Sequence, residues 1–264
     1  MTQHDLVVQP AAPTGLAAVG VAVRRALISQ LHPKMLLAIL LPFFVAVVGA
    51  ILLLWLFWTP LTNWLDTSVL EGSYVDSVDA WLMQVGLFSV KLYLVPLLAA
   101  LMLLPMAGIL GLAVAAIFIM PMVLRHLETR EYAGLVRKGS LVATYGWWNA
   151  IWVMALFVIG WVLTLPLWLI PPLALILPVF WWSFAFSRML RVDALLEHAD
   201  ETERRYLWKR HNRQYWLLGL LLALLNLFPL TWLILPTLSA LVFAHFSLEA
   251  LRQLRALPVA PQAH

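Results

Sequence analysis

Four long windows without Asp, Glu, Lys or Arg constrain the fold of this chain more than any other feature of its sequence. They cover residues 35–65, 92–124, 139–187 and 214–248, which together make up more than half of the 264 residues. A helix that crosses a bilayer needs about 20 apolar residues. Each window is therefore long enough to enter a membrane, and the third is long enough for a pair of helices.

The composition excludes the soluble classes of protein. Hydrophobic residues make up 63% of the chain and charged residues 11%, whereas a soluble domain has about 45–50% and about 25%. The net charge is +4, but the basic residues lie beside acidic ones rather than in one stripe, so no nucleic-acid partner is expected. The absence of cysteine excludes disulfides, thiolate metal sites and a cysteine nucleophile. An integral membrane protein remains, with the lipid bilayer as its first partner.

The signs of the charges between the windows predict an orientation. Residues 66–79 contain four acids and no Lys or Arg, whereas the other charged segments are rich in Lys and Arg. Short loops rich in Lys and Arg stay in the cytoplasm, so 66–79 is expected outside and both termini inside. Residues 35–65 then cross outward and 80–124 cross back. Each of 139–187 and 214–248 enters and leaves on the cytoplasmic side as a helical hairpin.

Prolines interrupt both hairpins and leave their depth in the membrane open. They are Pro166, Pro171, Pro172 and Pro178 in the first hairpin, and Pro229 and Pro236 in the second. Proline inside a helix removes a hydrogen bond and clashes with the preceding turn. The uninterrupted arms are about 12–18 residues long, mostly short of a full span. We favour hairpins that dip partway into the bilayer; two full, tilted helices in each hairpin are the alternative.

The predicted fold is a single all-α integral membrane domain over residues 14–256. It has two long transmembrane helices and two proline-broken helical hairpins, which are hemi-penetrating or short transmembrane. Residues 1–13 and 257–264 are expected to be disordered. The predicted parts, in chain order, are an interfacial helix at 14–32, a transmembrane helix at 34–58, an outside loop at 59–78, a long helix with a crossing at 79–124, a cytoplasmic segment at 125–147, the first hairpin at 148–187, a cytoplasmic connector at 188–213 and the second hairpin at 214–248.

Enzyme motifs are missing from the sequence. It has no nucleotide-binding glycine loop, no GxSxG elbow and no HExxH pair. The seven histidines are scattered, and no two have metal-ligand spacing on one helix. We therefore predict no enzyme, no catalytic residue, no metal and no cofactor.

Three groups of charged or titratable residues are interpreted as structural. His245 lies inside an apolar arm, only four residues before Glu249, and is interpreted as an interfacial histidine that reaches the membrane boundary. Asp76 and Asp79 are assigned to an acidic outside loop or a helix cap rather than to a catalytic pair. The connector at 188–213 is predicted to be a solvated helix with i,i+4 ion pairs such as Glu201 with Arg205, with a docking or oligomer surface as the alternative.

Short proline-centred motifs follow one another in a characteristic order. They are Ser29-Gln30 with Pro33, Leu40-Leu41-Pro42, Pro96, Pro121-Met122 before Leu124 and Leu127-Glu128, Arg191-Val192-Asp193, and Leu225-Asn226-Leu227-Phe228-Pro229 through Pro236. In this order and spacing the chain resembles the etoposide-induced 2.4 / CysZ family of bacterial inner-membrane proteins, whose best-known members are sulfate permeases. The resemblance covers roughly residues 15–256.

The resemblance implies two long crossings, two partly penetrating hairpins, homo-oligomers and passage of sulfate without ATP. Sulfate-binding members carry Gly-Leu-Arg directly after the proline that matches Pro33, where this chain has Lys34-Met35-Leu36. One ammonium thus replaces a backbone cradle with a guanidinium, and Lys and Arg are not interchangeable for oxyanions. Lys34, Arg24 and Arg25 are the candidate anion-binding residues. The alternative role of Lys34 is to anchor the topology.

We therefore predict a multi-pass protein of the bacterial inner membrane, with both termini in the cytoplasm, that acts as a permease or channel for sulfate or another small inorganic anion. The changed residues after Pro33 and the charged connector leave an alternative open. In that alternative the chain is a non-transporting membrane scaffold or partner-binding protein of the same fold.

Overall fold

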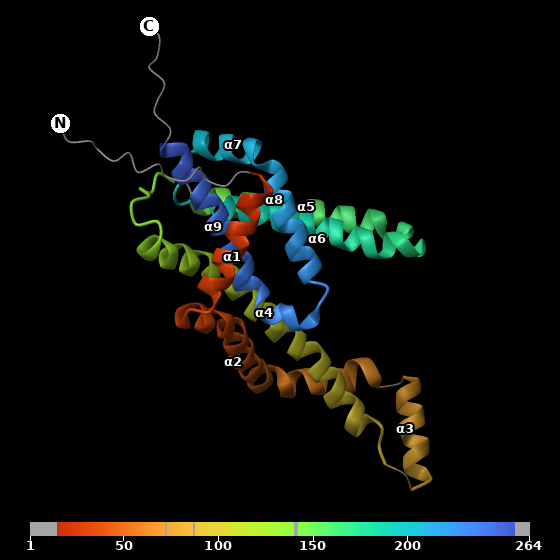
Figure 1. The fold of residues 1–264 in the computed structure, drawn as a ribbon. Helices are drawn as coiled ribbons and strands as arrows, with labels where there is room; N and C mark the ends of the chain where they lie inside the picture. Colours follow the sequence, from red (N-terminus) through yellow and green to blue (C-terminus); the bar gives the residue numbers. More distant parts are fainter. Residues whose placement is uncertain (1–14, 72, 87, 140–141, 257–264) are drawn as a thin grey trace, which may run out of the picture. The chain divides into compact units, whose positions relative to one another are not determined.

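The computed structural model describes residues 15–71, 73–86, 88–139 and 142–256, and these ranges hold helices and no strand (Figure 1). The predicted disordered ends at 1–13 and 257–264 lie outside them. The chain divides into two compact units. Unit 1 combines residues 1–36 with residues 119–264, and unit 2 comprises residues 37–118.

The helices follow one another with short connections. In chain order they are α1 Leu16–Gln30, α2 Pro33–Trp64, the π-helical η1 Leu65–Leu70, α3 Tyr74–Gln84, α4 Lys91–Arg130, α5 Val142–Thr164, the 3-10 helix η2 Leu165–Leu169, α6 Pro171–Asp193, α7 Glu201–Arg210, α8 Asn212–Leu225, the 3-10 helix η3 Pro229–Leu233 and α9 Leu235–Ala256.

Four helical segments of the described residues are long and apolar enough to cross a bilayer. They are Pro33–Thr67, Lys91–Gly108, Thr144–Leu169 and Pro171–Asp193. The predicted all-α membrane fold is therefore confirmed.

The two hairpins differ in length. In the first, α5 and α6 have 23 residues each, more than the arms that were predicted. Pro171 and Pro172 occupy the first turn of α6, where proline removes no helical hydrogen bond, and the helix continues through Pro178. In the second hairpin α8 has 14 residues, fewer than the about 20 of a crossing, and α9 has 22.

Several boundaries differ from the prediction. The helix expected over 79–124 is divided, because α3 ends at Gln84 and α4 begins at Lys91. Gly86 lies between them with φ of 80°, a left-handed conformation that commonly ends a helix. Residues 59–70, expected in an outside loop, are helical in α2 and η1.

Unit 2 is held together by a small apolar cluster and by the acidic residues near α3. Leu65, Leu70, Val95 and Ala99 form the buried cluster. The Asp79 carboxylate accepts hydrogen bonds from the Lys91 backbone N–H at 3.1 Å and from the Ser89 hydroxyl at 2.9 Å. Asp79 therefore caps the start of α4, which confirms its predicted structural role. The Lys91 ammonium also forms ion pairs with Asp76 at 2.5 Å and Asp66 at 3.6 Å.

The core of unit 1 is built around α9. Between Leu235 and Leu251 nearly every side chain of this helix is buried, because α1, α6 and α8 pack against it. A close approach joins α6 to α8 at Gly219. A Cβ at Gly219 would lie 2.5 Å from the Ser183 carbonyl oxygen and 3.1 Å from the Ser187 Cβ, so only glycine fits there without a shift.

The connector between the hairpins contains the short helix α7, but it is less solvated than predicted, because Leu195, Ala199 and Leu207 lie in a buried apolar cluster. Asp200 caps α7 and accepts a hydrogen bond from the Glu203 backbone N–H at 2.8 Å, while the Glu203 side chain accepts one from the Asp200 N–H at 3.0 Å. Glu201 and Arg205 form the predicted i,i+4 ion pair. This capping box stabilises a short and mainly polar helix that propensity alone would leave marginal.

Candidate anion-binding site

Two histidines from distant parts of the sequence meet in unit 1. His32 lies in the link between α1 and α2, where its carbonyl accepts the Leu36 N–H at 3.0 Å and thereby starts α2. His126 lies near the C-terminal end of α4. Their ring centroids are 4.6 Å apart, with an interplanar angle of 48°. His126 is buried and His32 is half-buried.

Two permanent cations surround this pair. Lys34 and Arg130 are exposed, and both act electrostatically on His32 and on His126. In the described ranges no carboxylate forms an ion pair with His32, Lys34, His126 or Arg130. We call these four residues the basic cluster. Its positive charge is not balanced by a paired acid of the protein.

The basic cluster keeps its two imidazoles in the neutral form near neutral pH. Desolvation lowers the pKa of both His32 and His126 below the ordinary value of 6.5, and the charges of Arg130 and Lys34 lower both further. The Lys34 backbone N–H also donates to His32 Nδ1 at 3.3 Å, which favours the tautomer protonated at Nε2. An anion that binds beside these rings would raise the pKa of both histidines, because it stabilises the protonated form.

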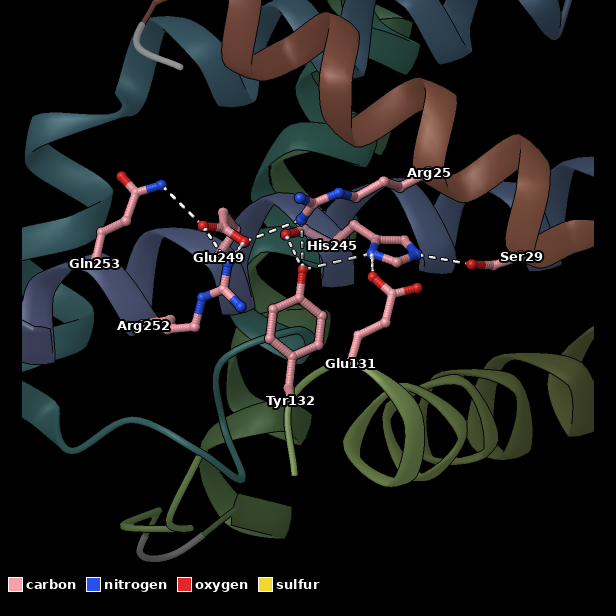
Figure 2. A network of polar contacts seen from close by, with 8 residues as sticks. All are labelled: Arg25, Ser29, Glu131, Tyr132, His245, Glu249, Arg252 and Gln253. Carbon is pink, nitrogen blue, oxygen red and sulfur yellow. Dashed lines mark hydrogen bonds and ion pairs between the residues drawn. The ribbon is translucent and has the colours of Figure 1, made fainter. Parts of the chain in front are cut away.

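A second polar group lies nearby and ties α1 to α9 (Figure 2). The His245 Nε2 and the Ser29 hydroxyl are 3.0 Å apart, and the Tyr132 hydroxyl donates to the His245 carbonyl at 3.3 Å. The Glu131 carboxylate lies 3.6 Å from His245 Nδ1. His245 is 1% exposed, so the prediction of an interfacial histidine is wrong. The physical reason is that α1 packs over this part of α9 and takes the place of solvent or lipid.

Arg25 and Glu249 extend the same network, as Figure 2 shows. The Arg25 guanidinium donates to the Glu249 carboxylate at 3.0 Å and to the Tyr132 hydroxyl at 3.5 Å. Arg252 and Gln253 donate to the same carboxylate at 2.7 Å and 3.1 Å. These hydrogen bonds help to hold the pKa of Glu249 below its ordinary value, against desolvation, which raises it. The network is therefore charged and internally satisfied.

The three predicted cations have different surroundings. Lys34 belongs to the basic cluster. Arg25 has its charge paired with Glu249. Arg24 is exposed, and because successive helical residues point about 100° apart, it faces a different side of α1 from Arg25. The structure thus brings only Lys34 of the three to the histidine pair.

His126 and Arg130 were not predicted, because no local pattern marks them. His32 and His126 are more than 90 residues apart, and neither lies in a motif that implies a pair. Gln30 gives a further signal that only the fold shows. Its side chain is 6% exposed, and neither its amide nitrogen nor its amide oxygen has a hydrogen-bond partner among the described residues. Buried amides are usually paired, so one at this end of α1 is consistent with a polar ligand.

The polar network borders a small cavity and has no cluster of metal ligands among the described residues. A cavity of about 50 Å³ lies beside the network and is lined by Arg25, His211, His245 and Glu249, among others. It has room for only a few water molecules. The described part of the chain also contains no group of three or more His, Cys, Asp or Glu side chains that could hold a metal ion.

The fold and the site define a multi-pass helical membrane protein with unbalanced positive charge at the start of a candidate span. The family described as Sulfate transporter CysZ/Etoposide-induced protein 2.4 matches residues 22–236, and the chain belongs to this family. The resemblance noted in the sequence is thereby confirmed. A search of curated proteins gave no significant match, and a search of solved structures gave none.

Proposed function

We propose that the protein is a permease or channel for a small inorganic anion such as sulfate, and that the basic cluster binds the anion. The observation that carries this proposal is that four cationic or protonatable side chains converge with no paired carboxylate among the described residues. Like charges that converge without acids are unfavourable unless an anion or solvent compensates them. Membership of the family supports sulfate as the first anion to test.

In this proposal the residues of α4 supply what the segment after Pro33 lacks. Sulfate-binding relatives have an arginine two residues after the glycine, and this chain has Leu36 at that position. Met35, which precedes it, is fully buried. Arg130 restores a guanidinium from another helix, and His32 and His126 add ring N–H donors. Arg24 adds exposed positive charge on α1, and Arg25 positions α1 through its pair with Glu249.

The proposal includes a location and an assembly. The charge signs support both termini in the cytoplasm of a bacterium, with the protein in the inner membrane. A homo-oligomer would cover part of the apolar side chains that α2, α4 and α5 expose.

Flux of radiolabelled sulfate into liposomes that hold the purified full chain tests the proposal. We expect sulfate uptake above that of empty liposomes, with chloride measured in parallel by a fluorescent indicator. Uptake equal to empty liposomes for both anions would contradict it. The scaffold alternative predicts that result, together with a specific partner captured by crosslinking in the host membrane.

Sulfate flux is expected to rise as the pH falls from about 7.5 to about 5.5. The pKa values of His32 and His126 lie below 6.5, so both rings are neutral at pH 7.5 and gain protons as the pH falls through their pKa values. Protonation adds positive charge to a cluster that already faces Lys34 and Arg130, and anion binding becomes more favourable. The double variant His32→Gln, His126→Gln should lose this pH dependence.

The same shifts predict the direction of the stability change, which provides the control. A histidine whose pKa is lower in the folded state than in the unfolded state stabilises the fold above pH 6.5, and this contribution is lost as the pH falls through the folded pKa. Thermal unfolding measured at each pH separates this loss from transport. A sulfate flux that decreases as the pH is lowered, while the fold stays intact, would contradict the prediction.

A further inference from the structure

We propose that the groove between α6 and α8 binds an anionic phospholipid, with one acyl chain along the groove and the headgroup phosphate at Arg213 and Arg188. The groove has a volume of about 990 Å³, which is within the size range of small-molecule sites. It is separate from the basic cluster and does not depend on transport.

The walls of the groove are apolar along most of their length. Phe180 and Ile176 on α6 line the groove together with Leu220 and Leu224 on α8, and among the described residues the polar lining is Ser183, Asn212 and Arg213. Ile176, Phe180 and Leu224 are 58%, 47% and 44% exposed. Apolar surface of this kind is stable only against lipid chains or another protein.

Two of the polar lining residues, Asn212 and Arg213, lie together at one end. They are the first two residues of α8. Trp216 follows one turn further along α8, and the Arg188 guanidinium of α6 lies over its ring, 5.7 Å from the ring centroid. In the ranges that the structure describes, neither Arg188 nor Arg213 forms an ion pair with a carboxylate. Trp216 also stacks on Phe180, with centroids 5.8 Å apart. Tryptophan beside arginine at the end of an apolar groove matches the level of lipid headgroups.

The length of the groove matches one leaflet of a bilayer. From Arg213 to Leu224 the helix rises about 16 Å at about 1.5 Å per residue, close to half of the about 30 Å hydrocarbon core. A phospholipid with its phosphate at Arg213 would therefore place its acyl chain beside Leu220 and Leu224. Two uncompensated guanidinium groups select an anionic headgroup over a zwitterionic one.

A second copy of the chain fits this groove less well. If two copies insert with the same orientation, a two-fold axis between them runs along the membrane normal. An isologous contact along the groove would then place Arg188 and Arg213 of both copies at the same depth and close together. Their repulsion opposes that contact, whereas it adds to the attraction of an anionic lipid.

Native mass spectrometry of the delipidated full chain tests the proposal. The probes are phosphatidylglycerol and phosphatidylcholine with identical acyl chains, and inorganic phosphate. We expect the apparent affinity for phosphatidylglycerol to exceed that for phosphatidylcholine by about thirtyfold. Arg188→Gln with Arg213→Gln should remove this preference. Leu220→Trp should weaken the binding of both lipids, because the larger side chain fills the groove. Arg205→Gln removes one arginine from α7 as a control, and it should change neither the lipid preference nor the affinity for the two lipids.

Three results would overturn the proposal. The first is equal affinity for the two lipids, or a preference that survives the double substitution. The second is full competition by inorganic phosphate, which would mean that the arginines bind a free anion rather than a lipid. The third is a Leu220→Trp variant that changes subunit number but not lipid binding, which would assign the groove to a second copy. Because Arg188 packs on Trp216, the exposed Arg213→Gln alone provides the test if the double variant fails to fold.

Discussion

The double substitution Lys34→Ala, Arg130→Ala is expected to reduce sulfate flux in liposomes about a hundredfold, with about tenfold for each charge. Both side chains are exposed, so their loss should leave the fold intact. Both act on His32 and His126, so their removal also raises the pKa values of these histidines and makes the imidazoles easier to protonate. The flux that remains should therefore depend more strongly on acid than that of the parent chain.

Two single substitutions serve as matched controls for that result. Arg125→Ala removes an exposed arginine from α4, one residue before His126, and Arg205→Ala removes one from α7. Neither acts on the histidine pair, and neither should change flux by more than about twofold. An equal fall in all three variants would mean that the net charge of the surface, rather than the basic cluster, sets the rate.

Gly219→Ala is expected to destabilise unit 1 by about 1–3 kcal/mol, and Gly219→Leu by more, because added volume in a closely packed interface forces helices apart. The atom that a Cβ would meet at 2.5 Å is the Ser183 carbonyl oxygen. It belongs to the backbone of α6 and cannot rotate away as a side chain would. The whole α6–α8 pair must therefore separate. Thermal unfolding in detergent measures the effect, with a fall of about 2–4 °C for each kcal/mol.

Gly20→Ala provides the matched control on another helix. Gly20 is an exposed glycine of α1, and a Cβ there would meet nothing within 4 Å. Alanine favours helix over glycine by about 0.8–1.0 kcal/mol, so this variant should be at least as stable as the parent chain. Equal destabilisation at positions 20 and 219 would contradict the close approach of α6 and α8.

Much of the fold could be predicted from where charges and prolines stand. Three of the four uncharged windows locate the candidate spans, because burial of a charge in hydrocarbon is costly enough to exclude Asp, Glu, Lys and Arg from long stretches. The window at 139–187 holds two of these spans, whereas the described residues of the window at 214–248 hold none. The arms of the first hairpin were predicted too short mainly because they were begun at 148 and ended at 187, whereas α5 begins at Val142 and α6 continues to Asp193. Pro171 and Pro172 were also treated as breaks. At the first turn of α6 they begin the helix instead.

The candidate site could be predicted only in part. Lys34 was marked by its position after Pro33, a local feature. The placement of His126 and Arg130 in the site, and the burial of His245, depend on which helices pack together. The residue pattern within one helix does not indicate its packing partners. His245 and Glu249 looked like a membrane boundary because they are four residues apart on an apolar arm. The deciding partner, Ser29, is more than 200 residues away.

The pairing of α1 with α9 has a consequence for the synthesis of the protein. About 220 residues separate the start of α1 from the start of α9, and ribosomes add about 5–20 residues per second. For roughly 10–40 s, therefore, Arg25 and Ser29 lie on the nascent chain without their partners Glu249 and His245 of α9. Packing of α1 on α9 can occur only after α9 has been made, so this step joins two segments around everything that is inserted between them.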